Sequence, residues 1–205
     1  PMVAGSILMG STDLVDKGMA ATLSPGSVAS LNYGNKIIAA VLTLATTAIG
    51  TAVLPYFTRM VSEKDWKNIR SILKSYLSLI FAVGILTAIV IYLFSDSIVN
   101  IIFQRGSFTA EDTTVVSAVQ AYFAFQIPFY IGGIVVVRLI SALRANHILM
   151  WGAAINLVVN IGFNILFIHY LGLKGIALST SFVYLISFLF LVYFANRIII
   201  QEERM

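Results

Sequence analysis

Six long apolar stretches follow one another along this chain, and short polar segments separate them. Each approaches or exceeds the ~20 predominantly apolar residues that a transmembrane helix needs. None shows the alternation expected of a lipid-facing barrel strand, and only a helix satisfies its backbone hydrogen bonds within one span. The pattern therefore predicts an all-α lobe of six transmembrane helices, over residues 2–23, 28–61, 66–94, 110–145, 148–171 and 175–200.

Composition supports a membrane protein and excludes a soluble globular domain. Of 205 residues, 59% are hydrophobic and 11% charged, whereas a soluble domain has about 25% charged residues. The net charge of +4 lies in the gaps between apolar stretches, which is typical of membrane topology and not of nucleic-acid binding. The chain lacks cysteine and begins with Pro1 inside an apolar stretch. We therefore expect a piece of a longer protein.

Positive charge gathers in alternate gaps. The gaps after the second and fourth stretches and the tail after the sixth hold nine basic residues, whereas the other gaps hold two. The richer set comprises Arg59, Lys64, Lys67, Arg70, Lys74, Arg138, Arg144, Arg197 and Arg204. The positive-inside rule places this set in the cytoplasm, and both ends of the chain with it.

Two stretches depart from a simple span. Within residues 62–77, large apolar side chains such as Trp66 and Ile69 recur every three or four positions between basic residues. This spacing predicts an amphipathic helix that lies on the inner leaflet and leads into the third span. In the fourth stretch, Gln126 and Pro128 predict a bent helix with a polar lining.

Charged residues also occur inside two predicted spans. Asp13 and Lys17 are four positions apart and can pair, whereas Asp16 can face another direction. Lys36 follows Asn32 in the second span. Intramembrane charge normally faces a cavity or a partner, so we expect a cavity that Asp16 and Lys36 share, with Asp13, Lys17, Asn32 and Lys36 binding the substrate. Two alternatives remain. The charges of the first span could neutralise one another at a helix end, and Lys36 could extend its ammonium group to the headgroup region.

The fifth stretch carries three asparagines at four-residue intervals, Asn156, Asn160 and Asn164. Such a stripe is typical of hydrogen bonding between helices. With Asp16 and Thr180, it also provides the oxygen ligands that a hard cation such as Na⁺ prefers. We expect no other cofactor and no enzyme activity, since the two histidines are far apart and no phosphate-binding glycine loop is present.

Four segments resemble one family in order and spacing. Residues 14–36 carry an acidic–basic pair and then GSVASLNYGNK, residues 50–55 read GTAVLP, residues 102–113 read IFQRGSFTAEDT, and residues 171–178 read LGLKGIAL. Together they resemble the MurJ/MviN family of lipid II flippases, which belongs to a superfamily with multidrug (MATE) and polysaccharide exporters. The loop at 102–113 is the most specific match.

The resemblance implies a fold and a function. The chain would be the second six-helix lobe, helices seven to twelve, of a MATE-like transporter in the bacterial inner membrane. With an N-terminal lobe of the same protein, it would move an undecaprenyl-pyrophosphate-linked saccharide to the outer leaflet by alternating access. Lys36 matches a cavity arginine of the family, and Asp16, Asn156, Asn160 and Thr180 fall where some members hold Na⁺.

Two departures from the family pattern leave the substrate open. Residues 40–45 replace a P-x-G-x-x-G segment, and residues 146–150 replace D-T-K-T-P. An exporter of another lipid-linked polysaccharide therefore remains an alternative. So do a MATE-type drug/cation antiporter and a scaffold of wall synthesis that transports nothing.

Overall fold

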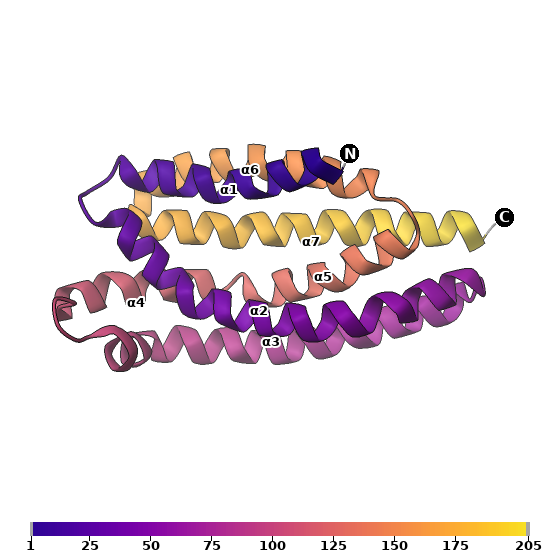
Figure 1. The fold of residues 1–205 in the computed structure, drawn as a ribbon, viewed down its shortest axis with the longest axis horizontal. Coiled ribbons are helices and arrows are strands. Elements are labelled where there is room, and N and C mark those ends of the chain that lie inside the picture. The colour runs from indigo at the N-terminus through magenta and orange to yellow at the C-terminus, as the bar shows by residue number, and fades with distance from the viewer. Residues whose placement is uncertain (1, 204–205) are drawn as a thin grey trace.

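The computed structural model describes residues 2–203, except for the side chains of residues 2–10, 51 and 52. This part of the chain forms helices joined by short turns (Figure 1). They are α1 (Met2–Ala21), α2 (Ser27–Ser62), α3 (Trp66–Phe103), α4 (Ala110–Ala124), α5 (Ile127–Ala142), α6 (His147–Leu171) and α7 (Leu173–Glu203).

The helices run back and forth along one axis, so their connections lie at two ends (Figure 1). One end, which we call the basic end, holds the α2–α3 turn, the α5–α6 turn and the C-terminal end of α7. The α1–α2, α3–α4 and α6–α7 connections lie at the other end. The basic-rich connections thus lie together, as predicted. That this end faces the cytoplasm stays a prediction.

Two apolar cores fill the bundle along its length. One contains Leu31 and Ile38 of α2, packed with Phe123 of α4 and Ile176 of α7. The other lies nearer the basic end and includes Phe57, Ile69, Leu139 and Ile199. Large apolar side chains such as Leu86 and Val158 are exposed on the outside of the bundle, which is the distribution expected of a protein surrounded by lipid.

Four of the described helices are long and apolar enough to cross a membrane, namely α2, α3, α6 and α7. Helices α4 and α5 together pass the same test as one broken span, bent by 41° between Ala124 and Ile127. The predicted bend is therefore confirmed. Helix α1 has 20 residues, three of them charged, and is not among the helices that pass; its crossing stays a prediction.

The prediction that the apolar face of residues 62–77 lies on the inner leaflet is wrong. Trp66 begins α3, which continues without a break to Phe103. Ile69 and Leu73 are buried in the core near the basic end, so the apolar face of this segment packs against protein and not against lipid. Arg138, which we expected in a connection, lies inside α5 beside Gly50 of α2.

Helices α6 and α7 form a tight hairpin. Gly172 has a φ of 57°, a conformation that glycine adopts without steric penalty. A Cβ atom at Gly175 would collide with the backbone carbonyl of Phe167. Backbone atoms cannot move aside as a flexible side chain can, so the close contact depends on glycine at this position.

Candidate transport site

The Asp16 carboxylate lies at the contact of three helices. It belongs to α1, is 7% exposed, and accepts hydrogen bonds from α6 and α7. The Nδ2 atoms of Asn160 and Asn164 donate to Oδ1 at 2.9 and 2.7 Å, and Oγ1 of Thr180 donates to Oδ2 at 2.8 Å. We call these four residues the Asp16 cluster. The structure thus brings together three of the four predicted ion ligands.

Asn156, the fourth predicted ligand, does not contact Asp16. Its Nδ2 donates instead to Oγ of Ser187 at 3.0 Å, which links α6 to α7. Asn164 takes its place beside the carboxylate. The stripe of asparagines contained the necessary signal, but sequence spacing did not show which two of the three side chains face α1.

The Asp16 cluster contains the oxygen atoms of one carboxylate, two amides and one hydroxyl, although both amides present their nitrogens to Asp16. No ion pair to Asp16 occurs among the described residues, and Oδ1 of Asn164 is buried without a hydrogen-bond partner. A buried carboxylate without a counter-charge is strongly disfavoured, and oxygen ligands suit hard cations. These residue types suit a small cation if the Asn160 and Asn164 amides turn their oxygens toward it, or a proton on Asp16. No group of three or more His, Cys, Asp or Glu residues that could hold a metal occurs in the described chain.

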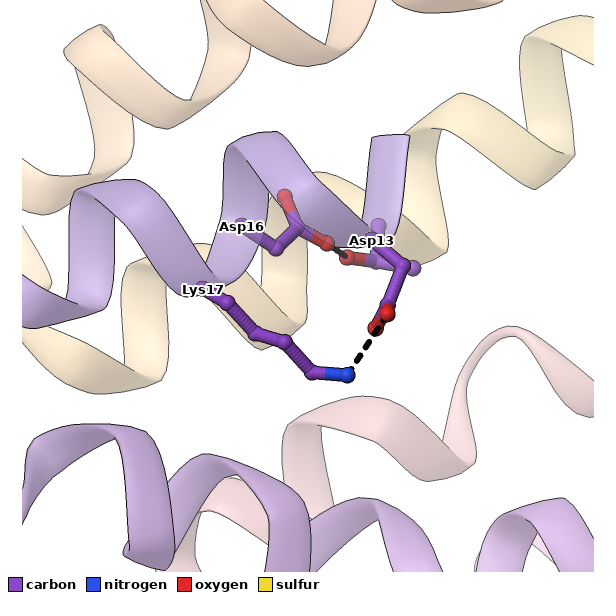
Figure 2. Close-up of polar contacts among 4 residues, drawn as sticks. Asp13, Asp16 and Lys17 are labelled. Atoms are coloured by element: carbon purple, nitrogen blue, oxygen red, sulfur yellow. Dashed lines mark hydrogen bonds and ion pairs between the residues drawn. The ribbon is translucent and has the colours of Figure 1, made fainter. Parts of the chain in front are cut away.

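Asp13 and Lys17 form an ion pair on another side of α1. The Lys17 Nζ atom lies 2.6 Å from Asp13 Oδ2, and Figure 2 shows the two side chains meeting while Asp16 points away from them. All three residues line a cavity of about 210 Å³, as does Asn32 of α2. We call it the polar cavity. Its other polar lining comes from Thr12, Asn35, Thr43, Gln126, Tyr130, Thr180 and Tyr184.

The expectation that Asp16 and Lys36 share one cavity is not met. Lys36 is exposed and lines a different pocket of about 760 Å³, together with Arg105 and Phe108. Its Nζ atom lies 5.6 Å from the centre of the Tyr33 ring. Asn32 and Asn35 project from one face of α2 into the polar cavity, whereas Tyr33 and Lys36 project from another. Sequence reasoning identified these residues but not the helix rotation that separates them.

The arrangement of the helices is similar to one lobe of membrane transporters whose structures are known. An outward-facing multidrug-resistance MATE-family transporter aligns with a TM-score of 0.79 at 18% identity, over 94% of this chain and 42% of the other. Lipid II flippase MurJ in an inward closed conformation aligns with a TM-score of 0.77 at 23% identity, over 94% of this chain and 41% of the other.

Within that class, the family is shown by sequence. The model of the lipid II flippase MurJ family matches residues 1–205, so the chain belongs to this family. Two relatives carry the name "Probable lipid II flippase MurJ". The one from Synechocystis sp. is 29% identical over 178 residues, 86% of this chain and 33% of its own length. The one from Thermotoga maritima is 28% identical over 190 residues, which are 88% of this chain and 37% of its own length. The chain spans about a third of their length.

Proposed function

We propose that the protein containing this chain moves an undecaprenyl-pyrophosphate-linked saccharide from the inner to the outer leaflet of the bacterial inner membrane. The chain would form its second lobe, with both ends cytoplasmic, and would alternate access with an N-terminal lobe. The observation that carries this proposal is the polar cavity in a chain that matches the flippase family from end to end. A hydrated polar space lowers the cost of moving a charged headgroup through hydrocarbon.

We further propose that the Asp16 cluster binds the coupling cation, with Na⁺ as the candidate. Asp16, Asn160, Asn164 and Thr180 would supply its oxygen ligands. The Asn164 amide would turn its Oδ1, which is buried without a hydrogen-bond partner, toward the cation. A bound cation would also neutralise Asp16. The polar cavity would then hold only the balanced Asp13–Lys17 pair, a better environment for an anionic headgroup.

A drug/cation antiporter is the second candidate, and one observation favours it. Among the described residues, two carboxylates but only one ammonium group line the polar cavity, because Lys36 lines the other pocket. A cavity with this balance attracts a cation when Asp16 is not neutralised. The family match favours the flippase.

The decisive test measures leaflet accessibility of a labelled lipid-linked precursor in cells that depend on the full-length protein. The double variant Asp13→Asn/Lys17→Gln removes the ion pair without changing net charge or leaving either partner unpaired. We expect it to lower flipping, whereas Lys67→Gln, on the exposed face of α3, should not. Unchanged flipping in the double variant would refute the substrate role of the polar cavity. A scaffold should tolerate both variants, and an antiporter should instead lose efflux of a cationic dye.

A further inference from the structure

A groove at the basic end lies between the start of α6 and the last turns of α7, with a volume of about 630 Å³. Three basic side chains line it: Arg144 from the α5–α6 connection, His147 at the start of α6, and Arg197 of α7. We call it the basic groove. Its apolar wall consists of Trp151, Ile155, Phe190, Phe194 and Ile198.

The apolar wall opens onto the outside of the bundle. Trp151 is 62% exposed and is followed on the same face of α6 by the exposed residues Ile155 and Val158. Gly152 leaves room for the Phe190 ring, since a Cβ atom there would approach Phe190 Cε1 to 3.3 Å. The groove therefore combines basic groups at the membrane surface with an apolar surface that extends toward the membrane interior.

Basic groups outnumber acidic groups among the described residues that line the groove. The described ion pairs involve neither Arg144 nor Arg197. Glu202 is the one carboxylate among the lining residues, against two guanidinium groups and an imidazole. Guanidinium groups bind phosphate oxygens through two parallel hydrogen bonds, and basic pockets between transmembrane helices suit anionic lipid headgroups.

The backbone at Arg144 provides a matched control. Arg144 has a φ of 56° and follows the end of α5, where the Ala145 amide donates to the Ile140 carbonyl at 3.1 Å. Glycine is the residue that such a helix end prefers. Lys64 takes the same position after α2, with a φ of 55°, but does not line the groove. Changing either residue to glycine relieves the same strain and removes one positive charge from the same end.

We infer that the basic groove binds an anionic phospholipid. Arg144, His147 and Arg197 hold its phosphodiester group, and one acyl chain lies along Trp151 and Phe190. This site is separate from the polar cavity and from the Asp16 cluster, since no residue lines both the groove and the polar cavity. The inference does not depend on what the protein transports.

The test is native mass spectrometry of the purified full-length protein, titrated with phosphatidylglycerol or with zwitterionic phosphatidylcholine. Wild type should retain phosphatidylglycerol preferentially. Arg144→Gly/Arg197→Gln should weaken that binding about 25-fold, since each of the two basic groups contributes about a factor of five. Lys64→Gly/Lys67→Gln removes the same charge from the same end and should retain wild-type affinity.

Three outcomes would overturn the inference. Equal binding of the two lipids by wild type would show that the groove does not select an anionic headgroup, or that another protein segment covers it. Equal losses in the two double variants would show a general effect of surface charge. Unchanged binding in Arg144→Gly/Arg197→Gln would place the lipid elsewhere. Size-exclusion profiles confirm folding, which Arg144→Gly should not impair because it relieves strain.

Discussion

The Asn164 side chain donates a 2.7 Å hydrogen bond to the carboxylate of Asp16, which lies 148 positions earlier in the chain. This contact joins α6 to α1, and Asn160 repeats it one turn away at 2.9 Å. Asn156, a further turn along α6, bonds to Ser187 of α7 instead. Chemically identical side chains on one helix therefore have different roles. Asn160 and Asn164 bind a buried carboxylate, whereas Asn156 links two neighbouring helices.

The different partners of these asparagines predict different costs of substitution. Asn164→Leu removes a donor from a buried carboxylate and should destabilise the protein by about 2–3 kcal/mol, whereas Asn156→Leu removes a neutral hydrogen bond and should cost about 1 kcal/mol. Thermal unfolding of the full-length protein in one detergent gives the ranking. Equal shifts in the midpoint temperature would contradict the special position of Asn164.

The proposed ion site predicts a dependence of stability on Na⁺. Replacing choline chloride with sodium chloride should raise the unfolding temperature of wild type, because a ligand that binds only the folded state stabilises it. Asp16→Asn should abolish the shift. Asp96→Asn, which changes an exposed carboxylate on α3, should retain it. A sodium shift that survives in Asp16→Asn would rule out Asp16 as a ligand.

The separation of Lys36 from Asp16 predicts that two measurements respond independently. If Lys36 contacts the substrate, Lys36→Ala should lower flipping about fivefold, equivalent to roughly 1 kcal/mol. Its sodium-dependent stabilisation should remain that of wild type, since Lys36 and Asp16 line different cavities. Lys36→Arg preserves the charge and should retain most activity. Loss of the sodium shift in Lys36→Ala would contradict the separation.

The contact between α2 and α4 depends on a glycine. A Cβ atom at Gly34 would lie 2.6 Å from Cγ1 of Val119 and 3.2 Å from the Gln120 backbone nitrogen. Gly34→Ala should therefore destabilise the protein by about 1–3 kcal/mol through overpacking. Gly18→Ala is the control, because nothing lies within 4 Å of that position, and it should be neutral or stabilising by up to about 1 kcal/mol. A lower unfolding temperature for Gly18→Ala than for Gly34→Ala would refute this account.

Local chemistry made much of the fold predictable. A capping box begins α4, with Oγ1 of Thr109 accepting from the Asp112 amide and the Asp112 carboxylate accepting from the Thr109 amide, and the T-x-x-D spacing that produces it is visible in the sequence. The predicted bend near Pro128 is confirmed. These features depend on residues close in sequence, so spacing and side-chain type were sufficient.

The arrangement of the site was less predictable because it depends on how helices rotate against one another. Ile69 and Leu73 have the spacing of a lipid-facing surface, but a protein core uses the same spacing. Lys36 lies four positions after Asn32, and the structure still directs the two side chains into different cavities. Such distinctions require the positions of neighbouring helices, which the local pattern does not contain.

The hairpin held closed at Gly175 has a consequence for the Asp16 cluster. Asn160, Asn164 and Thr180 all belong to this hairpin, whereas the carboxylate belongs to α1. The cluster therefore joins two structural units, with the acceptor on α1 and the donors on the α6–α7 hairpin. A slide or tilt of α1 away from the hairpin would therefore remove all three hydrogen-bond donors from the carboxylate in a single movement.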